Sequence, residues 1–305
     1  MRLACIGIGS NAIRLLVASW CDGKLVAERR ERRGTRLFAG LVNGALTEKS
    51  MESSVEAIGE LAGIARADGV QGLFVFATSA VRDAANGHIF TARAEQACGA
   101  PVEIITGEEE AALSYIGASE DGSCGVMDIG GGSTEFTLGD GESILGAISL
   151  QMGAVRMNGQ IPVLSLESYR ETVALCEQII RRDAQALLVC PPRHVWMGVG
   201  GTMTTLGAMK RQIPLFDSDT CEGMRMTFDE VSEWGTKLAA MSLDERRQVP
   251  GLMPHRADII PSGIAILEAA MRCFSMEALH LSAHGNMDGY LKRRFRELAK
   301  SNALS

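Results

Sequence analysis

The chain has 305 residues, of which 46% are hydrophobic and 22% are charged. This length and balance are typical of two folded domains and exclude a largely disordered chain. The net charge of −7 argues against a general nucleic-acid binder, which normally carries a basic surface.

The eight cysteines are scattered, with no CxxC pair, which argues against a zinc knuckle and against a disulfide framework. No apolar run reaches the length of a membrane span, and the first residues lack the pattern of a signal peptide. We therefore expect a cytoplasmic protein without a membrane partner.

The first residues predict three strands joined by tight turns. Residues 2–8 are mostly apolar and predict the first strand, Gly9-Ser10-Asn11 predict a loop, and residues 12–18 predict the second strand. Asp22-Gly23 is a typical hairpin turn and leads into a third strand over residues 24–30.

The same pattern returns in the second half. Its parts are a strand over 125–129, the loop Gly130-Gly131-Gly132-Ser133, a strand over 134–138, a turn at Asp140-Gly141 and a strand over 143–149. An offset of 121 residues separates Gly7 from Asp128, and the same offset separates Arg14 from Glu135. We interpret this repetition as an internal duplication.

Helices and strands alternate after each set of strands. The first half continues with a helix over 48–68 and a strand over 73–77. The second half continues with helices over 166–188, 202–210, 261–271 and 288–300 and strands over 194–199 and 279–282. In the last helix, we interpret Lys292, Arg293, Arg294 and Arg296 as a solvated face. The fold class is therefore α/β, with one lobe over 1–119 and a second over 120–305.

Asp128 ends a predicted buried strand just before the glycine loop at 130–133. Because glycine has no β-carbon, the backbone amides of such a loop can approach a phosphate closely. A carboxylate beside phosphate oxygens needs a cation between them, so Asp128 and Glu135 are predicted to bind Mg²⁺ or another hard divalent cation. The alternative is a structural glycine turn that Asp128 caps.

Three further segments carry groups suited to phosphate. They are Gly9, Ser10, Asn11 and Arg14 at the first loop, Ser79 and Arg82 after a buried strand, and Gly200, Gly201 and Thr202 at a helix start. Backbone amides, hydroxyls, guanidinium groups and helix N-termini all favour phosphate oxygens. An outward-pointing Arg14 and an ordinary structural turn at Gly200 are the alternatives.

The helix that begins near residue 107 starts with Glu108, Glu109 and Glu110. Acidic residues at a helix start commonly complement the helix dipole. One of them could instead accept a proton from an attacking water molecule. The residue pattern alone leaves open which of the three would do so.

Seven segments in order resemble the Ppx/GppA phosphatase family of exopolyphosphatases and guanosine pentaphosphate phosphohydrolases, within the superfamily of actin, Hsp70 and sugar kinases. They are IGSNAIRLLV (8–17), ATSAVRDAANG (77–87), TGEEEAALSYIG (106–117), DIGGGSTEF (128–136), MGAVR (152–156), GVGGTMTTL (198–206) and PGLMPHRADIIPSG (250–263). The resemblance implies two RNase-H-like lobes with a cleft between them. It also implies Mg²⁺-assisted attack of water on the terminal phosphate of inorganic polyphosphate or of pppGpp, with Glu110 as the catalytic glutamate and Asp128 and Glu135 beside the metal.

The sequence departs from the family pattern at two places. Gly7 and Ala12 replace an Asp and a Ser or Thr of the first loop, and Gly285-Asn286-Met287-Asp288-Gly289 replaces the family's GLREG. We expect a working exopolyphosphatase. A pppGpp phosphohydrolase, a non-catalytic sensor of polyphosphate or nucleotide, and an ATP-dependent phosphotransferase remain open, as does a homodimer formed through the second lobe.

Overall fold

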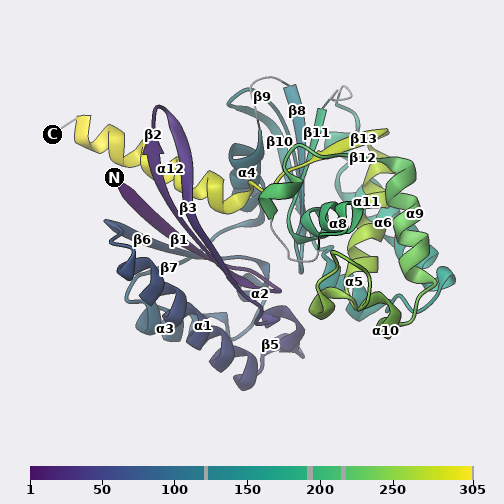
Figure 1. Cartoon of the computed structure of the whole chain (residues 1–305), viewed down its shortest axis with the longest axis horizontal. Coiled ribbons are helices and arrows are strands. Elements are labelled where there is room, and N and C mark those ends of the chain that lie inside the picture. Colours follow the sequence, from purple (N-terminus) through teal and green to yellow (C-terminus); the bar gives the residue numbers. More distant parts are fainter. Residues whose placement is uncertain (120–122, 191–194, 214–217, 304–305) are drawn as a thin grey trace. The chain divides into compact units, whose positions relative to one another are not determined.

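The computed structural model describes residues 1–119, 123–190, 195–213 and 218–303 (Figure 1). The chain divides into two α/β units. Unit 1 consists of Met1–Gly117 and Asn286–Ser305, and unit 2 consists of Ala118–Gly285. The predicted division at residue 119 placed the last helix in the second lobe, whereas the structure groups this helix with unit 1.

Unit 1 contains a five-stranded sheet with the order β3-β2-β1-β6-β7. The strands are β1 (Arg2–Ile8), β2 (Ile13–Cys21), β3 (Lys24–Arg33), β6 (Gly72–Ala77) and β7 (Val102–Ile104). The first three strands pair in antiparallel fashion, and β6 and β7 extend the sheet in parallel with β1. This is the strand order of an RNase-H-like lobe, as expected.

Helices cover both faces of this sheet (Figure 1). Helices α1 (Glu48–Ala67) and α3 (Gly87–Cys98) lie together on one side, and α12 (Asn286–Ala303) packs against β1, β2 and β3. Strand β1 is buried on both faces, as expected for a strand between two helical layers. Shorter elements complete unit 1: η1 (Leu37–Gly40), β4 (Leu41–Val42), β5 (Ala45–Leu46), α2 (Ser79–Arg82) and α4 (Gly107–Ala118).

Aromatic packing explains why α12 belongs to unit 1. Tyr290 stacks on Phe76 of β6 with ring centroids 4.7 Å apart, and Phe295 lies 5.6 Å from the ring of Trp20. The α12 backbone also packs closely on α4, because a β-carbon at Gly289 would collide with the carbonyl oxygen of Leu113. These apolar contacts are all with the sheet and the helix of unit 1.

The prediction of a solvated basic face on α12 is wrong for most of its members. Among the four basic residues of that prediction, only Arg296 is exposed. Lys292 donates to the carbonyl oxygens of Ile116 and Gly117 at 3.0 and 3.1 Å, at the end of α4. Burial lowers the pKa of the Lys292 ammonium group. The run therefore fixes α12 to unit 1.

Unit 2 contains a six-stranded sheet with the order β10-β9-β8-β11-β13-β12. The strands are β8 (Ser123–Ile129), β9 (Thr134–Asp140), β10 (Ser143–Leu150), β11 (Val195–Val199), β12 (Arg225–Thr227) and β13 (Ala278–Leu281). The first five positions repeat the order of unit 1, and β12 adds an antiparallel edge. Sheet order therefore supports the interpretation of the repeat as a duplication.

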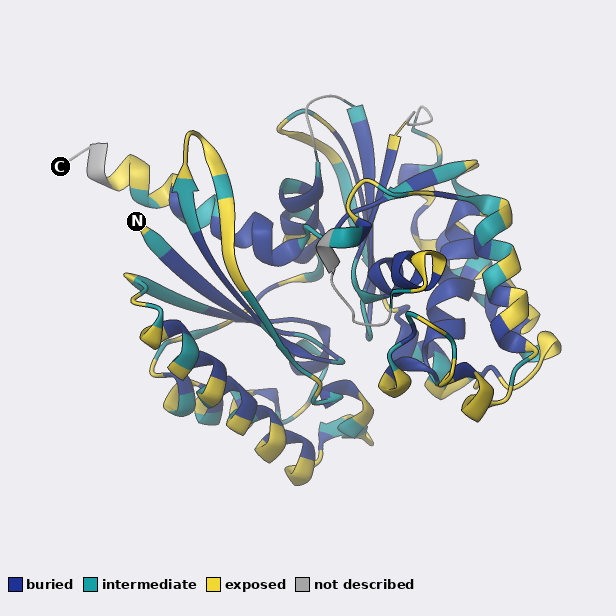
Figure 2. Ribbon diagram, in the orientation of Figure 1, coloured by how far each residue is buried: buried dark blue, intermediate teal, exposed yellow. Residues whose placement is uncertain are grey.

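Several helices of unit 2 pack around α11 (Ile260–Cys273), which is buried over almost its whole length (Figure 2). The others are α5 (Ala154–Gln160), α6 (Leu166–Asp183), α7 (Gln185–Leu188), α8 (Gly201–Arg211), α9 (Phe228–Ala239) and α10 (Leu243–Arg246), with the short turns η2 (Ser218–Cys221) and η3 (Pro254–Arg256). Helices α5, α6 and α9 pack against α11. Among the helices of the described residues, none combines the length and the apolar character that a membrane crossing needs.

Two local predictions in unit 2 need correction. The helix predicted over 166–188 breaks at Ala184 into α6 and α7, because Ala184 leaves the helical conformation there. The predicted turn at Asp140-Gly141 lies one residue later, since Asp140 pairs with Ser143 and still belongs to the sheet. The turn residues are therefore Gly141 and Glu142.

Candidate functional site

The first predicted loop of unit 1 presents backbone amides. It joins β1 to β2, and Gly9 N–H closes it by donating to Ala12 O at 3.2 Å. The carbonyl oxygens of Ser10 and Asn11 accept from Phe38 N–H and Arg36 N–H at 2.8 and 3.1 Å. The amides of Ser10 and Asn11 have no hydrogen-bond partner among the described residues. Two adjacent free N–H groups suit an anion.

The second glycine loop, in unit 2, has the same construction. Gly130 N–H donates to Ser133 O at 3.0 Å, and the carbonyl oxygens of Gly130 and Gly131 accept from the first residues of α5, Ala154 and Val155, both at 2.9 Å. The amides of Gly131 and Gly132 have no partner in the described part of the chain. Ser133 is buried.

Gly153 and Arg156 hold this second loop in place, and neither is among the site residues predicted from the sequence. A β-carbon at Gly153 would collide with the backbone of Gly131, so the close approach of α5 requires glycine. Arg156 Nε donates to Gly132 O at 2.6 Å. The MGAVR segment therefore anchors the loop. Its position in the sequence was a signal for this role: it follows the three strands of unit 2, just as residues 36–38, which bond the first loop, follow the three strands of unit 1.

Asp128 lies beside the third predicted loop. Gly200 has φ = +93°, and a β-carbon there would lie 2.6 Å from Asp128 Oδ1 and 2.7 Å from Ile129 O. Only glycine fits this conformation and this contact. The structure thus brings Asp128 against Gly200, immediately before α8 begins at Gly201. One carboxylate lies next to two glycine loops of unit 2.

Gly201 and Thr202 form the first turn of α8. The guanidinium group of Arg256 packs over the Cα atom of Gly201, where a β-carbon would collide with it. Thr202 is 1% exposed, and its hydroxyl lies against Gly263 of α11. The structure thus brings Arg256, from the segment PGLMPHRADIIPSG, to the glycine loop. At this turn, backbone amides are better placed than the Thr202 hydroxyl to contact a phosphate.

Asp128 and Glu135 are directly opposite each other across β8 and β9. They are 7% and 1% exposed, and Ser149 Oγ donates to Glu135 Oε1 at 2.6 Å. Two neighbouring buried carboxylates repel each other unless a cation compensates them. Their hard oxygen donors fit Mg²⁺, which is commonly held by one or two carboxylates with water and phosphate as further ligands. The described residues contain no group of three or more metal-binding side chains.

The three acidic residues at the start of α4 have different surroundings. Glu109 forms a capping box with Thr106, because Thr106 N–H donates to Glu109 Oε2 at 2.9 Å and Glu109 N–H donates to Thr106 Oγ1 at 3.1 Å. Glu108 is exposed. Glu110 is 6% exposed, and its Oε2 lies 3.4 Å from Arg82 Nη1. Geometry thus distinguishes Glu110 from its neighbours.

The remaining predicted residues of unit 1 lie near these groups. Arg82 Nη1 also donates to Ile105 O at 2.9 Å, so this arginine positions Glu110 as well as carrying charge. Ser79 Oγ lies 3.0 Å from Ser10 Oγ and links α2 to the first loop. Arg14 Nη2 donates to Asn286 Oδ1 at 3.2 Å.

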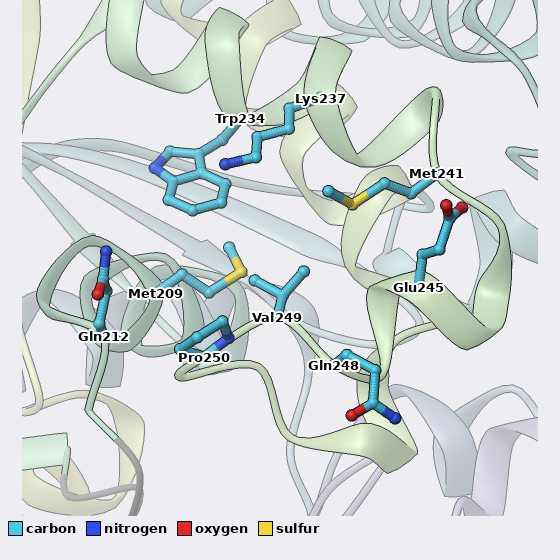
Figure 3. Close-up of a pocket in the computed structure, with 9 residues that line it drawn as sticks. All are labelled: Met209, Gln212, Trp234, Lys237, Met241, Glu245, Gln248, Val249 and Pro250. Atoms are coloured by element: carbon cyan, nitrogen blue, oxygen red, sulfur yellow. The ribbon is translucent and has the colours of Figure 1, made fainter.

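A cavity of about 250 Å³ in unit 2 lies apart from all these residues (Figure 3). It is lined by Met209, Gln212, Trp234, Lys237, Met241, Glu245, Gln248, Val249 and Pro250. Lys237 Nζ lies 4.8 Å from the centre of the Trp234 ring. The cavity is at the C-terminal end of α8, whereas Gly200 and Gly201 are at the N-terminal end. None of the predicted site residues lines it.

Known proteins resemble this chain along nearly its whole length. A protein of Mycobacterium tuberculosis named exopolyphosphatase 2 is 31% identical, with 94% of this chain and 97% of that protein covered. A protein of Vibrio vulnificus named guanosine-5'-triphosphate,3'-diphosphate pyrophosphatase is 29% identical, with 98% of this chain but 60% of that protein covered. Both names denote enzymes that hydrolyse phosphoanhydride bonds.

Solved structures give the same result. The crystal structure of an exopolyphosphatase-like protein superposes with a TM-score of 0.90 at 27% identity, covering 98% of this chain and 100% of the other. The Aquifex aeolicus Ppx/GppA protein superposes with a TM-score of 0.82 at 28% identity, covering 99% of each chain. A model of the Ppx/GppA phosphatase family matches residues 16–297. The chain belongs to the Ppx/GppA phosphatase family.

Proposed function

We propose that the protein releases the terminal phosphate of inorganic polyphosphate by attack of water, with a divalent cation such as Mg²⁺ bound at Asp128 and Glu135. The observation that carries this proposal is the position of Asp128, a buried carboxylate beside both glycine loops of unit 2. A phosphate bound by the loop amides would lie beside this carboxylate, which makes a cation necessary. The similar protein of nearly equal length named exopolyphosphatase 2 supports polyphosphate as the substrate.

Glu110 is the proposed proton acceptor for the attacking water. It is largely buried, and Arg82 fixes its orientation at 3.4 Å. A positioned carboxylate of this kind typically contributes about 10²- to 10⁴-fold to a rate by general base catalysis. Glu109, by contrast, is engaged in capping α4.

Each unit supplies fixed donors suited to a phosphate group. The amides of Gly131 and Gly132 in unit 2, and those of Ser10 and Asn11 in unit 1, are held by hydrogen bonds to the carbonyl oxygens of their loops. Donors that are already oriented need no rearrangement when charge develops, which is the main source of catalysis in phosphoryl transfer. A bound divalent cation would neutralise further negative charge on the phosphates.

A second candidate substrate is pppGpp, whose terminal phosphate is joined by the same kind of bond. The Vibrio protein named guanosine-5'-triphosphate,3'-diphosphate pyrophosphatase matches 98% of this chain, which favours this alternative. Residues for a guanine base would be required in addition to the phosphate loops.

The cysteines support a reducing compartment. All eight are free thiols, and burial raises the pKa of the Cys5 thiol far above its usual value. Free thiols are the rule in the cytoplasm, where disulfides are rare. We infer that the enzyme acts there.

The test is phosphate release from tripolyphosphate, long-chain polyphosphate, pppGpp and ATP in the presence of Mg²⁺. We expect release from polyphosphate, and at least a 100-fold loss of turnover in Glu110→Gln with substrate binding retained. Glu109→Gln is the matched control, and its turnover should stay within about twofold because it affects only the helix cap.

Other outcomes would redirect the proposal. Release from pppGpp alone would select the second candidate. Tight binding without release from any compound would indicate a sensor and would refute the enzyme. Equal losses in the two glutamine variants would remove the special role of Glu110.

A further inference from the structure

Three residues lie directly opposite one another across unit 1. Gly7 on β1 pairs with Arg14 on β2, and Arg14 pairs with Arg32 on β3. Residues in such a row point to the same face of the sheet, with neighbouring β-carbons about 5 Å apart. The side chains of Arg14 and Arg32 are therefore neighbours on this face, next to a position without a side chain.

The row Gly7–Arg14–Arg32 concentrates positive charge in a partly buried place. Burial lowers the pKa of the Arg32 guanidinium group, and the neighbouring charge of Arg14 lowers it further. Like charges directly opposite each other destabilise a sheet. On the same strand as Arg32, Arg30 pairs with Asp288 of α12 at 2.7 Å and Arg33 pairs with Glu60 at 2.6 Å. An anion bound at the row would relieve this repulsion.

Polar groups a few residues from Arg14 and Arg32 along the chain also point to a ligand. The chain that follows Arg32 returns to the first loop, where Arg36 N–H donates to Asn11 O at 3.1 Å. Thr35 Oγ1 and both polar side-chain atoms of Asn11 are buried, with no hydrogen-bond partner among the described residues. Buried polar atoms normally have partners, so these atoms mark a place for a polar ligand.

We propose that Arg32 and Arg14 together clamp a phosphate group of the substrate without the help of a metal ion. Each planar guanidinium can donate two hydrogen bonds to phosphate oxygens. The divalent cation then acts only at Asp128 and Glu135, because Gly7 supplies no carboxylate to the row of unit 1. The inference rests on the proposed function for the identity of the substrate as a chain of phosphates.

Binding of tripolyphosphate, measured by calorimetry with EDTA present, tests the clamp. We expect the wild-type protein to bind and Arg32→Gln to bind at least tenfold more weakly, with a reduced dependence of affinity on salt. Arg33→Gln is the matched control, because Arg33 is adjacent in sequence but is paired with Glu60 and Glu31. Its affinity should stay within about twofold of the wild type.

Arg32→Lys keeps the positive charge but removes the planar guanidinium with its paired N–H donors, so we expect an intermediate affinity. This variant also keeps the test valid if Arg32→Gln does not fold, which circular dichroism would show. Three results would overturn the proposal. The wild type could fail to bind in EDTA, Arg32→Gln and Arg33→Gln could weaken binding equally, or both Arg32 variants could bind as tightly as the wild type.

The clamp and the proposed function can fail separately. If tripolyphosphate binds through Arg32 in EDTA but no phosphate is released with Mg²⁺, the hydrolase fails and the clamp stands. If phosphate is released and Arg32→Gln has the same KM as the wild type, the hydrolase stands and the clamp is refuted.

Discussion

The β1–β2 hairpin of unit 1 and the β8–β9 hairpin of unit 2 share a four-residue loop, the same closing hydrogen bond and the same register. Gly7 lies opposite Arg14 in the first, and Asp128 lies opposite Glu135 in the second. In both, the following segment occupies loop carbonyl oxygens and leaves amides available. The side chains differ in sign: the hairpin of unit 1 carries Arg14, which has Arg32 of β3 beside it, whereas the hairpin of unit 2 carries two carboxylates.

This difference shows how a duplicated fold can acquire two roles. The backbone supplies anion-binding amides in both units, whatever the side chains are. The charge of the side chains beside each loop then determines the ligand. Arginines bind a phosphate directly, and carboxylates bind a cation. A substrate with several phosphates and a bound divalent ion needs both kinds of row.

Removing the carboxylate of unit 2 should have the largest effect. We expect Asp128→Asn to reduce kcat/KM by about 10²- to 10³-fold and to weaken the dependence of activity on Mg²⁺, because the cation loses a ligand. In EDTA, its melting temperature should equal or exceed that of the wild type, since the repulsion with Glu135 is relieved. Asp140→Asn changes an exposed carboxylate at the end of the neighbouring strand β9 and should change neither property. A Mg²⁺ titration that is the same for all three proteins would contradict the metal assignment.

The Gly200→Ala substitution should disrupt the contact between Asp128 and the third loop. Gly200→Ala should destabilise unit 2 by about 2 to 4 kcal/mol, because the β-carbon meets Asp128 in a left-handed conformation. Gly223→Ala is the control, since Gly223 has φ = +69° but open space around it, and it should cost only about 1 kcal/mol. Urea denaturation of both variants measures the difference. Equal costs would mean that the contact with Asp128 adds nothing.

Gly7→Asp would make the row of unit 1 more like that of unit 2. The new carboxylate would face Arg14, and we expect tripolyphosphate to bind about tenfold more weakly in EDTA as a result. The β-carbon would also lie 3.2 Å from Phe76 and 3.4 Å from Met287, so some stability should be lost. Gly7→Asn introduces nearly the same crowding without charge, and the difference between the two variants measures the effect of the charge. Identical affinities in both would argue against an anion at this row.

The smallest effect is expected at the bond between Ser10 and Ser79. Ser10→Ala and Ser79→Ala should each cost about 1 kcal/mol, because each removes one partner of a buried hydrogen bond. The double variant should cost little more than either single variant, which a double-mutant cycle would reveal. Fully additive losses would show that the two hydroxyls do not interact.

Much of the fold follows from the sequence pattern. The constant offset between Gly7 and Asp128 and between Arg14 and Glu135 predicts equivalent places in two sheets, and the strand registers agree with it. The location of α12 could not be predicted in this way. Its apolar face is evident, but periodicity does not tell which sheet that face covers, and the stacking of Tyr290 on Phe76 decides it.

The candidate site was predictable as a set of residue types and less so as a set of contacts. The glycine loops were visible because glycine is required where backbone approaches an anion. The pattern of acidic residues at α4 could not separate Glu109 from Glu110, because capping by Thr106 and contact with Arg82 depend on side-chain geometry. Arg32 lies in an arginine-rich strand, and only the strand register and the ion pairs of Arg33 distinguish the two residues.

The position of helix α12 affects how the protein folds during its synthesis on the ribosome. Unit 1 is completed by residues that are synthesised after all of unit 2. At typical translation speeds, making Ala118–Gly285 takes on the order of ten to thirty seconds. During this time, the apolar surface around Phe76 and Cys5 has no helix to cover it. The nascent sheet of unit 1 is therefore a natural client for a chaperone until the last helix emerges.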